Sequence, residues 1–91
     1  MNIDFSKPVE ESEVYPAEHS FRIIADAAAP VEEPLKKILG GYNVASPLTR
    51  GRASSGGKYI AYAVSLFLSA RAEHIRFDTE VKAVPGVRIM L

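Results

Sequence analysis

Hydrophobic residues follow a two-residue period in some stretches of the chain and a helical period in others. The two-residue period predicts a strand at residues 20–25, a short edge strand at 48–53 and a last strand at 87–91. The apolar run from Tyr59 to Ser69 predicts the longest strand. Both phases of that run are largely apolar, which is typical of a central strand with one face under helices and the other partly covered.

Two stretches have the apolar spacing of a helix. The first predicted helix begins with Pro30 or, more tightly, with Pro34, since proline suits a first helical turn. It ends at Gly40 and Gly41, because glycine readily takes the left-handed conformation found at helix stops. The second predicted helix spans residues 71–84. Its apolar stripe consists of Ala70, His74, Phe77, Val81 and Val84, widened by Ile75.

The order strand, helix, strand, strand, helix, strand is that of the α+β ferredoxin-like fold, written βαββαβ. Right-handed crossovers place both helices on one face of a four-stranded antiparallel sheet. The first residues contain prolines and scattered acids without a sustained period. We therefore expect a flexible acidic N-terminal arm at residues 1–18 and one folded domain at residues 19–91.

In this fold the two phases of each strand acquire different roles. The bulky phase lies under the helices and comprises Phe21, Ile23, Ile60, Val64, Leu66, Val87 and Ile89. The other phase faces outward and comprises Arg22, Ile24, Tyr59, Ala61, Ala63, Ser65, Phe67, Arg88 and Met90. An exposed apolar patch of this kind marks a partner or ligand site. Two occupants are open at this point: a second copy of the chain, or the N-terminal arm folded back over the sheet.

Composition narrows the class of protein. The chain has 91 residues, of which 47% are hydrophobic and 24% charged, as in an ordinary single-domain globular protein. The absence of cysteine removes disulfides and thiolate metal sites and suits a reducing cytoplasm, where we expect the protein to act. Neither a secretory signal nor an apolar run of about 18 residues is present, so we expect no membrane partner.

The basic loop is the first candidate ligand site. Arg50, Arg52 and Lys58 lie in a stretch without acids, and the glycines before Lys58 are similar to those of a phosphate-binding loop. That motif fails, because Arg52 stands where it requires glycine and Tyr59 where it requires Ser or Thr. The turn also precedes a strand instead of a helix. The three cations are therefore candidates for nonspecific contact with anions, or they simply keep a hairpin loop hydrated.

RNA binding and catalysis fit the sequence less well. RNA-recognition domains of this fold stack bases on aromatic residues of the two central strands, but the first strand offers Arg22, and Ala61 follows Tyr59 on the same face. The net charge of zero provides no broad basic surface. His74 and Asp78 lie one helical turn apart without a third ligand or a nucleophile. We expect no catalytic residue, no metal site and no cofactor.

Short motifs also connect the chain with a known family. They are Tyr15-Pro16 before the first strand, Ser54-Ser55-Gly56-Gly57-Lys58-Tyr59 before the long strand, and the terminal Val87-Arg88-Ile89-Met90-Leu91. In these motifs the sequence resembles the YbeD-like family of small, uncharacterised bacterial proteins, over residues 15–91. The resemblance implies a fold similar to the ACT-type regulatory domains that bind amino acids in metabolic enzymes. It also implies a link with lipoate attachment through gene neighbourhood, and it supplies no catalytic residues.

The resemblance to ACT-type domains adds one residue to the candidate ligand site. Those domains bind at the loop after the first strand, often at an Asp followed by Pro-Gly, at a subunit interface. Asp26 thereby joins Arg50, Arg52 and Lys58 as a ligand-binding candidate, although its loop lacks the glycine. The expected function is a noncatalytic regulatory or protein-interaction module that forms a homodimer and serves a metabolic protein. The alternative is a domain that senses a small metabolite, an amino acid or an anion; RNA binding ranks below both.

Overall fold

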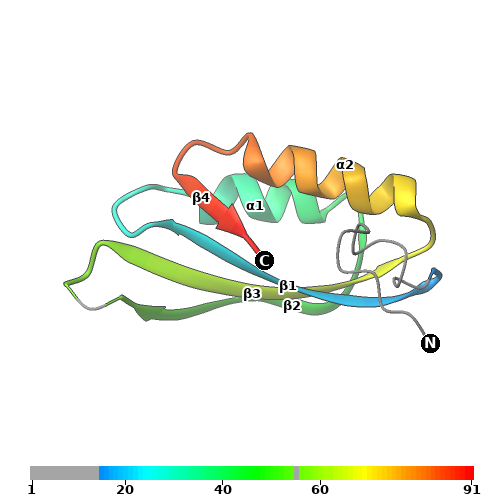
Figure 1. Cartoon of the computed structure of the whole chain (residues 1–91), viewed down its shortest axis with the longest axis horizontal. Helices are drawn as coiled ribbons and strands as arrows, with labels where there is room; N and C mark the ends of the chain where they lie inside the picture. The colour runs from blue at the N-terminus through cyan, green and yellow to red at the C-terminus, as the bar shows by residue number, and fades with distance from the viewer. Residues whose placement is uncertain (1–14, 55) are drawn as a thin grey trace, which may run out of the picture.

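The computed structural model describes residues 15–54 and 56–91, which form one antiparallel sheet and two helices (Figure 1). The elements are β1 (Ala17–Asp26), α1 (Glu32–Leu39), β2 (Asn43–Ala53), β3 (Tyr59–Leu68), α2 (Arg71–Lys82) and β4 (Val87–Met90). The strand order is β2-β3-β1-β4, and both helices lie on the same side of the sheet. The predicted ferredoxin-like βαββαβ fold is confirmed.

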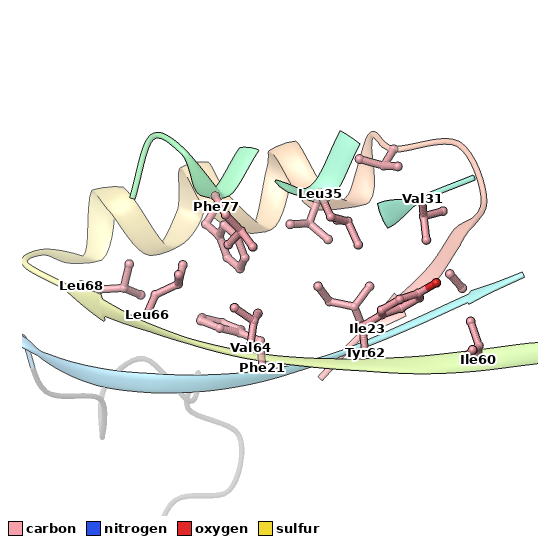
Figure 2. Packing of buried hydrophobic residues seen from close by; sticks show 14 residues of the cluster. Phe21, Ile23, Val31, Leu35, Ile60, Tyr62, Val64, Leu66, Leu68 and Phe77 are labelled. Carbon is pink, nitrogen blue, oxygen red and sulfur yellow. The ribbon is translucent and has the colours of Figure 1, made fainter. Parts of the chain in front are cut away.

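The two central strands, β1 and β3, pair over their whole length. The register runs from Ala17 opposite Leu68 to Asp26 opposite Tyr59. One phase of each strand points toward the helices and forms the core with residues of α1 and α2 (Figure 2). The largest fully buried side chains are Phe77, Ile23, Leu35, Leu66, Leu68, Val31 and Val81.

The folded part of the chain begins slightly earlier than expected. β1 starts at Ala17 instead of near residue 19, and Tyr15 before it packs against the core. The expected flexible arm lies outside the described residues as far as residue 14. Residues 17 and 18 belong to the sheet.

The first helix begins two residues before Pro34. Because the first amides of a helix have no acceptor within it, the missing N–H of Pro34 costs no hydrogen bond in the first turn. Acidic residues stand in the first turn and basic residues in the last, which suits the helix dipole. The expected left-handed stop is wrong. Gly40 has a φ of −60°, and its amide bonds to the carbonyl oxygens of Lys36 and Lys37 at 3.2 Å.

The second helix ends at Lys82, two residues before its predicted end. Phe77 and Val81 are buried, and His74 is half-buried with its ring centroid 5.3 Å from that of Phe21. Ile75 is 52% exposed, so the expected widening of the apolar stripe is wrong. Ile75 points away from the sheet because adjacent helical residues differ by about 100° around the axis.

The edge strand β2 starts at Asn43, well before the predicted residue 48, and with 11 residues it is the longest strand of the described chain. The expectation that the strand beginning at Tyr59 is the longest is wrong, since β3 has 10 residues. The pairing of β2 with β3 slips at three points along the strand. Pro47 lies within the second slip, between Ser46 and Thr49. A proline lacks the N–H that a regular ladder requires, so an irregular edge strand accommodates it where a central strand would not.

The outer edge strand β4 contains a bulge that changes its phase. Ile24 lies opposite Ile89, but the next residue, Ala25, lies opposite Val87. Arg88 is therefore the extra residue, as in a β-bulge. Val87 and Met90 pack against the core, whereas Ile89 is 51% exposed. The expected placement of Met90 outward and Ile89 under the helices is wrong, because alternation does not continue across a bulge.

A glycine just before β4 is expected to be essential for stability. Gly86 has a φ of +98°, and a Cβ there would overlap the Ala29 side chain and come within 3.1 Å of Val31 Cγ1. Gly56 has a similar φ of +88° with no atom within 4 Å of such a Cβ. Gly86→Ala should lower the free energy of unfolding by about 3 kcal/mol through strain and overpacking. Gly56→Ala should cost only about 1 kcal/mol, from strain alone.

Urea denaturation of the two variants and the parent chain measures both losses. The two substitutions place the same side chain at similar backbone angles, so the difference between them reports the contact with Ala29 and Val31. Equal losses would show that this contact does not constrain the turn.

Candidate functional site

The side of the sheet opposite the helices is the candidate functional surface, and we refer to it as the outward face. No element of the described chain covers it (Figure 1). The β1–β3 register places opposite residues side by side on this face. The pairs are Glu18 with Phe67, Ser20 with Ser65, Arg22 with Ala63, Ile24 with Ala61 and Asp26 with Tyr59.

The outward face combines exposed aromatic rings with small side chains. Phe67 and Tyr59 are each 41% exposed, at opposite ends of β3. Between them the outward positions of β3 are Ala61, Ala63 and Ser65. Because these side chains are short, the middle of the face is recessed relative to the two rings. Ser65 is 9% exposed, and its Oγ lies 3.0 Å from the Oγ of Ser20.

The structure places most of the predicted outward residues together. Arg22, Ile24, Tyr59, Ala61, Ala63, Ser65 and Phe67 share the face, Arg88 is exposed at its edge, and Met90 lies on the opposite side. Sequence reasoning missed Ile89 because of the bulge. It also missed Glu18 and Ser20, which the two-residue period would have included had the first strand been extended. Whether this surface binds anything stays a prediction.

A hollow lies on the outward face between β2 and β1. Its volume is about 170 Å³, and its lining consists of Arg22, Thr49, Arg50, Gly51, Ala61, Tyr62 and Ala63. Gly51 permits this close approach of β2 to β3, because a Cβ on Gly51 would lie 2.9 Å from the Ala61 carbonyl oxygen. Thr49 Oγ1 donates a hydrogen bond of 3.2 Å to the Ala63 carbonyl oxygen, which holds the rim in place.

A second hollow lies where β1 ends, and it contains two of the predicted ligand-binding residues. Its volume is about 470 Å³, with a lining of Asp26, Ala28, Gly57, Lys58, Tyr59 and Arg88. Arg88 Nε and one of its terminal nitrogens each donate a 2.9 Å hydrogen bond to the two Asp26 carboxylate oxygens. These hydrogen bonds from Arg88 hold the pKa of Asp26 below its ordinary value. Asp26 is thus already engaged by a cation.

The other two predicted ligand-binding residues lie elsewhere on β2. Arg50 lies opposite Tyr62, and its guanidinium is 3.5 Å from the Glu32 carboxylate. Arg52 is exposed and does not line the larger hollow. Burial raises the pKa of the Tyr62 phenol, and the negative charge of Glu32 adds to this effect. The four candidates therefore do not form one site.

The two histidines lie in an aromatic cluster. The Tyr15 hydroxyl is 2.6 Å from His74 Nδ1, and the His19 ring centroid is 5.3 Å from that of His74. Phe21 packs edge-on against His74. Within residues 15–54 and 56–91, no three His, Asp or Glu side chains gather as metal ligands would. This arrangement gives the histidines a packing role.

A polar contact that the sequence did not predict joins α2 to Tyr42, in the segment between α1 and β2. The Tyr42 hydroxyl donates a 2.7 Å hydrogen bond to Glu80 and accepts one of 2.9 Å from Arg76 Nε. The Arg76 guanidinium also lies 4.7 Å from the Tyr42 ring centroid, as in a cation–π contact. Burial raises the pKa of the Tyr42 phenol. Tyr42 packs on Phe77, so this cluster stabilises the helical layer.

Neither helix of the described chain has the length and apolar character needed to cross a membrane.

The fold is similar to solved structures. Protein HP0495 from H. pylori superposes with a TM-score of 0.74 at 22% identity, covering 100% of this chain and 94% of that one. A second solution structure of HP0495 gives a TM-score of 0.60 at 22% identity, covering 85% and 87%.

An ACT domain has the same fold. The ACT domain from GTP pyrophosphokinase of Chlorobium tepidum superposes with a TM-score of 0.66 at 9% identity, covering 81% of this chain and 94% of that one.

No curated protein matches the sequence. The sequence profile of a family described as "Protein of unknown function (DUF493)" matches residues 10–91. The chain therefore belongs to this family, the YbeD-like family that its short motifs indicated.

Proposed function

We propose that the chain is a noncatalytic regulatory module that binds proteins through its outward face and acts as a homodimer. The observation that carries the proposal is the exposure of Phe67, Tyr59 and Ile89 on the one side of the sheet that no described element covers. Large apolar side chains that are exposed on one face favour burial against another protein surface.

The proposed setting is the regulation of a metabolic protein. The ACT domain with the same fold is, by its description, part of a GTP pyrophosphokinase. The family resemblance adds lipoate attachment as the pathway in which a partner is to be sought. A small domain with a packed core, paired histidines inside an aromatic cluster and an open sheet face is better suited to association than to chemistry.

A charged residue on the outward face should prevent association. Phe67→Glu places a carboxylate where an apolar ring would be buried in the dimer, so it should raise the dimer dissociation constant at least tenfold. Sedimentation equilibrium across a concentration series measures this constant.

Ile75→Glu is the matched control, because Ile75 is an exposed apolar residue on α2, on the other side of the molecule, with 52% exposure against 41% for Phe67. It should leave the constant unchanged. A parent chain that stays monomeric at millimolar concentration, or an equal effect of both substitutions, would show that the outward face is not the association surface.

A second candidate function is the sensing of a small metabolite in the hollow at the end of β1. The structure brings Asp26, Lys58, Tyr59 and Arg88 around that hollow. Because Asp26 is paired with Arg88, the charge left for a ligand is that of Lys58. This arrangement favours an anionic group, such as a carboxylate or phosphate, over the amine of an amino acid.

An anionic ligand of this hollow should stabilise the fold. At a concentration one hundred times the dissociation constant, binding contributes about 2.7 kcal/mol. In a domain of this size, that raises Tm by roughly 10–20 °C. A thermal-shift panel of amino acids, lipoate, nucleotides and inorganic phosphate measures the effect. Lys58→Ala should abolish the shift and Lys36→Ala, on α1, should retain it; no shift at millimolar ligand would contradict the sensing function.

A further inference from the structure

We propose that two copies of the chain pack outward face against outward face in one particular arrangement. In it, Glu18 of each copy pairs with Arg22 of the other, and Phe67 of each copy sits in the hollow of the other. This inference rests on the proposed homodimer and specifies its geometry.

The outward phase of β1 carries an acid and a base without a partner. Glu18 and Arg22 are both exposed, and they stand two residues to either side of Ser20. Neither has an ion pair within the described part of the chain, whereas Asp26 on the same face is held by Arg88. Because residues four apart on a strand lie roughly 13 Å from each other, this acid and this base pair more readily between two copies than within one.

The shape of the outward face also differs between the Glu18 side and the Arg22 side of Ser20. Phe67 projects beside Glu18, at one end. The hollow of about 170 Å³ lies beside Arg22, near the middle of β1 and on the other side of Ser20. The hydrogen-bonded pair of Ser20 and Ser65 lies midway between them. Phe67 and the acid Glu18 thus lie on one side of this serine pair, and the hollow and the base Arg22 lie on the other.

A two-fold axis that runs across the strands over the serine pair exchanges these two sides. Each Phe67 then lies above Ala63 of the other copy, at the hollow, and each Glu18 lies above Arg22 of the other copy. Packed sheets are about 10 Å apart, a distance that these two long side chains span together. Such an interface is isologous, because each contact occurs twice.

The charges distinguish this arrangement from the main alternative. A two-fold axis parallel to the strands would bring Glu18 beside Glu18 and Arg22 beside Arg22. Like charges placed opposite each other oppose association. The axis across the strands replaces both repulsions with attractions.

The contact area predicts a weak dimer. About seven residues of each central strand overlap, and with β2 beside them the footprint over these three strands is roughly 350 Å² per copy. A standard specific interface buries about 800 Å² per partner. Association should therefore depend on concentration, and the end of the face at Tyr59 and Ile89 stays outside the contact.

Exchanging the charges tests the arrangement directly. Glu18→Arg leaves two bases on the face, and Arg22→Glu leaves two acids. Each should raise the dimer dissociation constant at least tenfold, because symmetry turns two attractive pairs into two repulsive ones. The double variant Glu18→Arg/Arg22→Glu should restore association. An equimolar mixture of the two single variants should also associate, since each base of one then faces an acid of the other.

Sedimentation equilibrium at low ionic strength measures every variant, and circular dichroism verifies that each is folded. Lys36→Glu, on α1, is the matched control, because it changes the net charge as Arg22→Glu does and should leave the constant unchanged. One outcome contradicts the arrangement alone: the parent chain dimerises and Phe67→Glu prevents dimerisation, but neither the double variant nor the mixture associates. The outward face would then remain the interface, with a different arrangement of the two copies. If the parent chain is monomeric at millimolar concentration, the arrangement and the proposed homodimer both fail.

Discussion

The pairing of β1 with β3 is the interaction on which the rest of the structure depends. The register is continuous over the ten residues of each strand, so every side chain of this pair is assigned to one of two faces. Phe21, Ile23, Val64 and Leu66 are buried under the helices as a result. A slip of one residue would exchange the faces and expose these side chains. The stability of the core therefore also determines which residues the outward face presents.

The strand pairing is regular at the centre of the sheet and irregular at its two edges. The hollow beside Arg22 and the ion pair of Arg88 with Asp26 both arise at these edges. At the β2 edge, the slipped pairing brings Gly51 against Ala61 and leaves the hollow beside Arg22. At the β4 edge, the bulge exposes Arg88, which then binds Asp26. Irregular pairing costs ladder hydrogen bonds but frees side chains to point in directions that a regular strand does not allow.

The sequence predicts the regular central strands better than it predicts the irregular edge strands. Period alone predicts the order of elements, the long strand and the residues under the helices, because burial imposes the alternation on the sequence. It fails at Met90 and Ile89, since a bulge leaves no mark in the pattern of apolar residues. It places the start of α1 at Pro30 or Pro34, and the helix begins between them, at Glu32, with Pro34 in its first turn.

The candidate site was predictable to a similar degree. Most residues of the outward face follow from the phase of β1 and β3. The pairing of Asp26 with Arg88 does not, because these residues are 62 positions apart and meet only after β4 has joined β1. For the same reason, Arg50 and Arg52 seemed to belong with Lys58 in one basic loop, although β2 carries Arg50 toward Glu32 on α1. Contacts between distant segments need the fold before they can be derived.

The distribution of charge along β1 makes the two proposed uses of the outward face compatible. Asp26 lies at the end of β1 nearest Tyr59 and is engaged by Arg88, so that end offers Lys58 to an anion. Glu18 and Arg22 lie toward the other end, around the serine pair, and have no such internal partner among the described contacts. A dimer centred on Ser20 leaves the hollow at Asp26 open. The same two strands carry both regions, and neither region covers the other.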